Sequence, residues 1–150
     1  MRILVTGGAG FIGSTFTRHL LADAYSGLAG AEVTVLDKLT YAGNLANLEP
    51  VEDSDRYEFV QGDICDPEVV RDLVGQADAV VHFAAESHVD RSILGGADFV
   101  LTNVLGTQTL MQAALETKLT KFVHVSTDEV YGSIETGSWD EKQPLEPNSP

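Results

Sequence analysis

The chain has little cysteine and little positive charge. Cys65 is the single cysteine among its 150 residues, so no disulfide can form within the chain and a reducing compartment fits. There are 9 Lys and Arg against 23 Asp and Glu, which gives a formal net charge of -14. Such a field repels phosphate backbones and anionic bilayers, so we expect no nucleic-acid and no membrane partner. The predicted localisation is cytoplasmic.

Long apolar runs are also missing. No stretch approaches the roughly 20 apolar residues of a membrane span, and residues 1–7 are too short an apolar start for a signal peptide. No Cys, His and Asp cluster has metal-ligand spacing, so no metal is predicted. His82 and His124 are expected to be satisfied core residues, and Cys65 an inert buried thiol.

Five short, mostly apolar segments alternate with helix-period segments along the chain. The expected strands are 3–5, 33–36, 57–60, 79–83 and 122–125. Continuously apolar strands are typical of a parallel sheet covered on both faces. Helices are predicted at 11–22, at 66–75 and from about 97 to 117, the last with an apolar face that includes Leu101, Val104, Leu105, Leu110 and Met111. This order predicts an α/β fold with a Rossmann-type, doubly wound parallel sheet.

A glycine-rich turn lies between the first expected strand and the first expected helix. The stretch Gly7-Gly8-Ala9-Gly10-Phe11-Ile12-Gly13 contains both G-x-x-G-x-x-G and G-x-G-x-x-G. Such glycines allow a tight turn, close approach of a pyrophosphate to the backbone, and close packing of helix on strand. The phosphates would meet the positive end of the helix dipole. We therefore predict a dinucleotide site, the alternative being an ordinary glycine turn.

Polar and small residues follow the other expected strands at the same sheet edge. Asp37 ends the second strand, where its carboxylate can accept hydrogen bonds from an adenosine ribose and would repel a 2'-phosphate. NAD is therefore favoured over NADP, although the neighbouring Lys38 leaves that preference open. Asp63-Ile64 and Phe83-Ala84-Ala85 end the third and fourth strands and would border the same crevice.

Asp128 and Glu129 come directly after the last expected strand. Neighbouring carboxylates repel each other, and the end of a buried strand is a costly place for them. The pattern alone favours a solvated turn. The alternative is a functional pair in a partly desolvated crevice, where protonation of one carboxyl relieves the repulsion on the other.

Taken together, these segments resemble the extended short-chain dehydrogenase/reductase family over the full 150 residues. The matching stretches are 6–13, 37–44, 63–64, 83–92 and 127–132. The second, fourth and last of them are similar to the family's dTDP-glucose 4,6-dehydratases in particular. The resemblance implies an NAD site whose residues are Gly7, Gly10, Phe11, Ile12, Gly13, Asp37, Lys38, Leu39, Thr40, Asp63, Ile64, Phe83, Ala84, Ala85, Ser87 and Thr102.

The same resemblance implies a lyase reaction on a nucleotide sugar. The family oxidises the C4 hydroxyl of dTDP-glucose, removes water across C5 and C6, and returns the hydride to C6. Glu129 would be the base at C5, Asp128 the acid at C6, and Thr127 a hydrogen-bond donor at the C4 oxygen. Ser87 would also contact the substrate, and Asn103 would support the active site or simply lie on a helix surface. The resemblance also implies a homodimer. The alternative functions are a UDP-hexose 4-epimerase and a non-catalytic NAD-sensing module.

One family feature is missing from the sequence. The family uses a Tyr-x-x-x-Lys pair, but the residues four places after the tyrosines, at positions 29, 45, 61 and 135, are Ala, Leu, Gln and Glu. That pair normally follows a segment like residues 146–150. We therefore expect residues 1–150 to be an NAD-binding Rossmann domain, incomplete at its C-terminal end, of a longer enzyme with a separate nucleotide-sugar domain. The alternative is a cofactor-binding fragment without the oxidising base.

Overall fold

A five-stranded parallel sheet forms the centre of the molecule. The computed structural model describes residues 1–148, and its strand order is β3-β2-β1-β4-β5. This order, with every neighbouring pair parallel, is that of a Rossmann-type sheet and confirms the predicted fold class. The strands are β1 (Arg2–Thr6), β2 (Glu32–Asp37), β3 (Tyr57–Gln61), β4 (Ala79–His82) and β5 (Lys121–His124).

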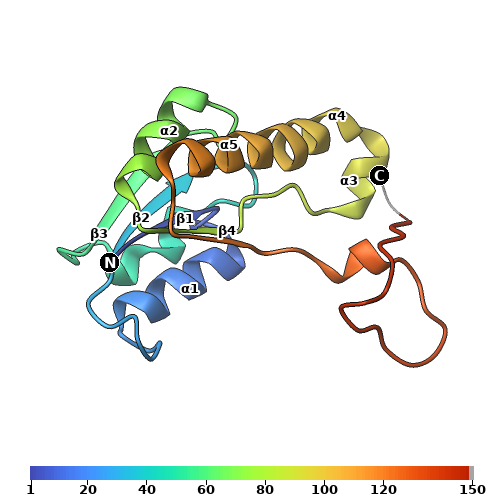
Figure 1. Ribbon diagram of the computed structural model, residues 1–150, viewed down its shortest axis with the longest axis horizontal. Helices are drawn as coiled ribbons and strands as arrows, with labels where there is room; N and C mark the ends of the chain where they lie inside the picture. The colour runs from blue at the N-terminus through green and yellow to red at the C-terminus, as the bar shows by residue number, and fades with distance from the viewer. Residues whose placement is uncertain (149–150) are drawn as a thin grey trace.

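Helices cover the sheet on both faces. Figure 1 shows α1 on one face and the pair α2 and α5 on the other. The α-helices are α1 (Phe11–Leu21), α2 (Pro67–Gln76), α3 (Val89–Leu94), α4 (Gly96–Phe99) and α5 (Thr107–Thr117), with a π-helical segment at Val100–Gly106 and 3-10 turns at Leu45–Asn47, Glu49–Val51 and Asp128–Tyr131.

Alternate residues of the central strands build two separate hydrophobic layers. Ile3 and Val5 of β1 pack with Leu20 of α1. Leu4, between them, faces the other way and packs with Val74 of α2 and Leu110 of α5. Because successive strand side chains point to opposite faces, the continuously apolar sequence of β1 serves both layers.

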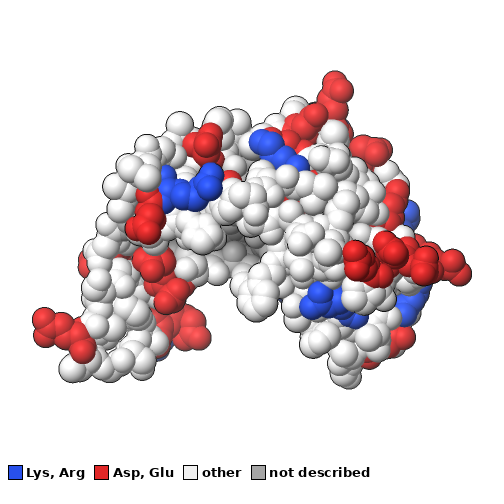
Figure 2. Space-filling view, turned by 180° about the vertical axis from the view of Figure 1, so that it is seen from behind, with Lys and Arg blue, Asp and Glu red and all other residues white. Residues whose placement is uncertain are grey.

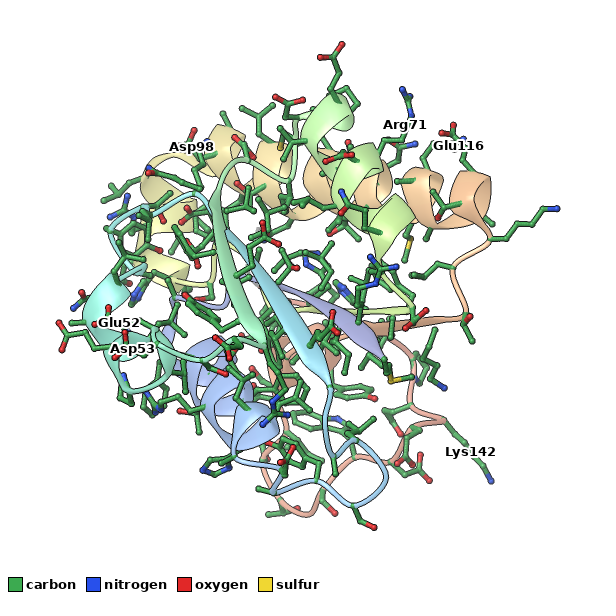
Figure 3. The ribbon with its side chains drawn as sticks, turned by 90° about the vertical axis from the view of Figure 1, so that its left-hand side faces the viewer. Glu52, Asp53, Arg71, Asp98, Glu116 and Lys142 are labelled. Carbon is green, nitrogen blue, oxygen red and sulfur yellow. The ribbon has the colours of Figure 1, made fainter. Side chains whose placement is uncertain are left out.

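Helix α2 begins as its sequence predicts. The Asp66 carboxylate accepts hydrogen bonds from the backbone N–H groups of Glu68 at 3.0 Å and Val69 at 3.3 Å, and Pro67 occupies the first helical position. Figure 3 shows Arg71 of α2 and Glu116 of α5 beside each other, and their 3.4 Å ion pair is exposed. An exposed pair contributes little, so buried packing does most to hold the two helices together.

The helical region before α5 differs from the prediction. The chain is helical from Gly96 to Thr117, but the segment Val100–Gly106 is π-helical. Leu110 of the predicted apolar face is fully buried, whereas Val104 is 62% and Met111 46% exposed. For Val104, on the π-helical segment, Figure 1 shows the reason: the first half of this helix extends past the strands, where no part of the sheet lies beneath it.

Strand β5 also differs from the prediction. The sequence predicts a buried strand, yet Val123 is 40% exposed, and Val125, just after the strand, is 39% exposed. Within residues 1–148, β5 pairs on one side only, with β4, so it forms an edge of the sheet. Figure 1 shows the chain continuing from this edge into a long segment beyond the sheet.

Acidic side chains dominate the surface. On the face in Figure 2, Asp and Glu side chains are spread over most of the outline and Lys and Arg form a few separate spots, in keeping with the net charge of -14. Across the described residues, no helix is both long and apolar enough to cross a bilayer.

Candidate functional site

The glycine-rich turn forms a close-packed cradle at the carboxyl end of β1. Gly7 has a φ of +70°, and a Cβ there would lie 2.6 Å from the backbone nitrogen of Ala84. A Cβ on Gly13 would collide with the Gly7 carbonyl oxygen. Helix α1 begins just after Gly10, which offers no side-chain cap, and its first turn has no acidic residue. The positive end of the α1 dipole is therefore left without an acidic side chain of its own, which suits a diphosphate.

Asp37 joins this turn to the end of β2. The residue is 8% exposed; its Oδ2 accepts a hydrogen bond from Ala9 N at 2.9 Å and its Oδ1 one from Leu39 N at 2.8 Å. The sequence predicted a ligand for ribose hydroxyls and missed this structural role. Each carboxylate oxygen has a second lone pair, so the two backbone bonds leave acceptor capacity for a ribose.

A crevice of about 100 Å³ opens beside the turn. Of the predicted cofactor residues, those lining it are Gly7, Asp37, Lys38, Thr40, Asp63, Ile64, Phe83, Ala84, Ala85 and Thr102. Those that do not line it are Gly10, Phe11, Ile12, Gly13, Leu39 and Ser87. The prediction missed five lining residues, which are Leu36, Ala42, Gly43, Gly62 and Glu86. Gly62 was detectable, because it closely follows the end of the predicted strand 57–60.

Lys38 forms an ion pair with Asp63 across the crevice, so its charge is not free beside Asp37. Its Nζ lies 2.6 Å from Asp63 Oδ2. The hydrogen bond to Asp63 raises the pKa of Lys38. Burial acts to raise the pKa of Asp63, but the hydrogen bonds from Lys38 and from Cys65 N outweigh it, so that pKa is lowered. Both groups are thus held in their charged forms. The Cys65 thiol behind them is half-buried, less buried than expected, and donates to the Leu101 carbonyl at 3.2 Å.

Asn103 lies on the π-helical segment and holds the chain that follows β4. Its Oδ1 accepts a hydrogen bond from Glu86 N and its Nδ2 donates one to Glu86 O, both at 2.9 Å. The neighbouring Thr102 lines the crevice. The side chain of Asn103 is therefore committed to a structural contact beside the crevice.

The acid pair lies on an exposed turn after β5. Thr127 caps the 3-10 turn Asp128–Tyr131: its Oγ1 accepts from Glu129 N at 3.3 Å and donates to Asp128 Oδ1 at 3.2 Å. Thr127, Asp128 and Glu129 are all exposed, as is Ser87. The partly desolvated crevice expected around the two carboxylates is thus not formed by residues 1–148. The turn is held by a stack of Tyr131 on Trp139, with ring centroids 5.7 Å apart.

The two strand histidines have different environments. His82 is 1% exposed; its Nδ1 lies 2.6 Å from Thr6 Oγ1 and its Nε2 lies 3.0 Å from Thr107 Oγ1. Burial, with a smaller contribution from His124, lowers the pKa of His82 to about 4. His124 is exposed, so the core expectation is right for His82 and wrong for His124. Within residues 1–148, no three His, Cys, Asp or Glu side chains are grouped so as to hold a metal ion.

The glycine cradle, the acid after β2 and the parallel sheet define a dinucleotide-type Rossmann domain, and comparison with known families places it further. Residues 4–150 match the model of the GDP-mannose 4,6 dehydratase family. The chain belongs to this family, and the sequence-based resemblance is confirmed.

Individual relatives are dTDP-glucose 4,6-dehydratases. The enzyme of Streptomyces niveus is 61% identical over 150 residues, which are 100% of this chain and 45% of the relative. The structure of DesIV, a dTDP-glucose 4,6-dehydratase from Streptomyces venezuelae with NAD and TYD bound, is 62% identical with a TM-score of 0.97, covering 99% of this chain and 46% of that one. The chain therefore spans less than half of the length of these relatives.

Epimerases are more distant. The UDP-Glc/GlcNAc 4-epimerase from Campylobacter jejuni has a TM-score of 0.87 at 32% identity, over 99% of this chain and 44% of that one. The fold is thus shared by both classes, while the sequence is much closer to the dehydratases.

Proposed function

We propose that this chain is the NAD-binding part of a nucleotide-sugar 4,6-dehydratase, a lyase that converts dTDP-glucose to dTDP-4-keto-6-deoxyglucose. The observation that carries the proposal is an acid pair on the turn that follows β5, in a sheet where the ends of other strands line a crevice suited to a dinucleotide. The chain is also 61% identical to a named dTDP-glucose 4,6-dehydratase. The carboxyl ends of parallel strands meet at one edge of the sheet, so cofactor and acid turn share that edge.

The residues present fit NAD. The cradle at Gly7 and Gly13 has no room for side chains. The backbone N–H groups of Phe11 and Ile12, at the start of α1, would face the diphosphate. Asp37 retains acceptor capacity for a ribose hydroxyl, and its charge disfavours a 2'-phosphate. When bound, NAD would accept the hydride from the sugar and return it to C6. The family's Tyr/Lys pair has no counterpart among the Tyr spacings of this sequence.

The chain's own acids would carry out the proton transfers. A ketone at C4 acidifies the C5 proton because the resulting carbanion is delocalised as an enolate; Glu129 would take that proton. Asp128 would protonate the departing C6 hydroxyl, and Thr127 would donate a hydrogen bond at the C4 oxygen. Two carboxyls of similar intrinsic pKa divide such roles only when their environments differ. Ser87, Asp128 and Glu129 are all exposed and so accessible to a substrate. Contacts with the bound sugar would then make the environments of the two carboxyls different.

Three wider assignments belong to the same proposal. Residues 1–150 would form the NAD-binding domain of an enzyme with a separate nucleotide-sugar domain. A cytoplasmic location is supported by the unpaired Cys65 and the charge of -14. A homodimer is supported by the exposed apolar side chains of Val104, Met111 and Leu115 on one helical region.

The test is product analysis with the natural full-length protein, NAD and dTDP-glucose. The expected product is a 4-keto-6-deoxy sugar, detected by the absorbance that such ketones develop in alkali and by mass spectrometry as the loss of one water. A product with inverted configuration at C4 and no loss of water would favour a 4-epimerase. Binding of NAD with no turnover of any nucleotide sugar would favour a sensor module.

A further inference from the structure

A hydrogen bond crosses from the loop after β2 to the loop after β4. The phenol Oη of Tyr41 donates to Glu86 Oε2 at 2.9 Å, across 45 positions of sequence. In the sheet β1 lies between β2 and β4, so no backbone ladder joins these two loops. The side-chain bond links them directly, on either side of the strand that leads into the glycine turn.

Both partners of this bond are held in place. The Arg91 guanidinium carbon lies 3.9 Å from the centroid of the Tyr41 ring, a cation–π contact. The backbone of Glu86 is fixed on both its N–H and its carbonyl by Asn103. Burial, and then the neighbouring Glu86 carboxylate, raises the pKa of Tyr41, so the phenol keeps the proton that it donates.

The bond joins two walls of the cofactor crevice. Thr40 and Ala42, on either side of Tyr41, line the crevice from the β2 loop, and Ala85 and Glu86 line it from the β4 loop. Tyr41 itself is 47% exposed and is not among the lining residues. It therefore lies on the outer side of the crevice. If either loop moved away from the other and so widened the mouth of the crevice, this bond would have to break.

We propose that the Tyr41–Glu86 pair is a latch that retains the dinucleotide between turnovers. This inference rests on the proposed function, in which the cofactor ends each cycle in its starting oxidation state and has no chemical need to leave. Slow release is then an advantage, and a charge-assisted hydrogen bond across the mouth provides it. Tyr41 acts as a positioning residue, since it holds the two loops and does not reach the reacting atoms.

The test is the dissociation rate of NAD from the natural full-length protein. Protein loaded with radiolabelled NAD is mixed with excess unlabelled NAD, and the label retained is followed over time. Tyr41→Phe removes only the hydroxyl that donates, and Glu86→Leu removes the carboxylate that accepts. We expect each to release NAD about 10-fold faster, as for loss of one hydrogen bond to a charged group. The double variant should be no faster than the faster single variant, because both changes break the same bond.

Tyr57→Phe is the matched control, because Tyr57 starts β3 and lies outside the crevice; its release rate should equal that of the wild type. Wild-type protein that binds no NAD would overturn the proposed function itself. Wild-type protein that binds NAD, with unchanged release from both single variants or with independent effects that multiply in the double variant, would overturn the latch and leave the proposed function standing.

Discussion

The strand ends on the two sides of this sheet are built differently. Around β1, β2 and β4, backbone and side-chain contacts are dense: Asp37 ties the glycine turn to the end of β2, and Asn103 holds the chain after β4. After β5, the acid-bearing turn is exposed and is held by its own Thr127 cap and a stack of two aromatic rings. The cofactor side is therefore pre-organised within these residues, and the acid turn is not.

Cofactor binding and proton transfer therefore depend on separate parts of the chain. A rigid cradle needs glycines and buried partners, so changes there should damage both folding and cofactor binding. An exposed turn tolerates substitution, so changes there should affect chemistry alone.

The largest effect is expected at the acid turn. Asp128→Asn combined with Glu129→Gln removes both proton-transfer groups, and general acid–base catalysis typically contributes 10² to 10⁴ in rate, so kcat/KM for dehydration should fall about 1,000-fold or more. Because both side chains are exposed and outside the crevice, the Kd for NAD and the thermal stability should stay unchanged. Glu135→Gln, an exposed acid a few residues on, is the control. Loss of NAD binding in the double variant would contradict the separation.

The opposite behaviour is expected at the cradle. In Gly7→Ala, the new Cβ would meet Ala84 N at 2.6 Å at a residue whose φ is +70°. Left-handed strain and overpacking should together lower the free energy of unfolding by about 4 kcal/mol and weaken NAD binding. Gly30→Ala is the matched control, with φ +75° and no atom within 4 Å of the added Cβ; it should cost about 1 kcal/mol. Urea unfolding of both variants measures the difference, and equal losses would mean that crowding at Gly7 is unimportant.

The same contrast explains what the sequence could predict. The glycine turn and the β-α alternation are local patterns whose geometry follows from a few residues, and the structure agrees with them. For Asp37 the sequence predicts the place at the end of β2 but not the hydrogen bonds from Ala9 N and Leu39 N. The exposure of Val104 on the predicted apolar face depends on how far the helix extends past the sheet, which no local pattern records. The bond from Tyr41 to Glu86 spans 45 positions and arises only once the strand order is known.

His82 lies between the two sides of the sheet, on β4 and opposite His124 of β5. Burial lowers the pKa of this histidine from 6.5 to about 4, so the unfolded chain takes up a proton in that range while the folded chain does not. Stability is therefore full above pH 6.5 and falls as the pH drops towards 4, by up to about 3 kcal/mol. Urea unfolding across this range should show the slope, and His82→Gln should flatten it. His19→Gln, at an exposed residue, should leave the slope unchanged; a flat wild-type profile would contradict the buried neutral histidine.

The smallest effect is expected where α2 begins, on the ordered side of the sheet. Asp66→Ala removes the carboxylate that accepts from Glu68 N and Val69 N, and loss of such a cap costs about 1 kcal/mol. Pro67 keeps the first helical residue in place, so the helix should persist and NAD binding should change little. Asp53→Ala, at an exposed acid labelled in Figure 3, controls for loss of one negative charge and should change stability by no more than a few tenths of a kcal/mol. If both variants lose the same stability, the effect belongs to net charge and the cap contributes nothing of its own.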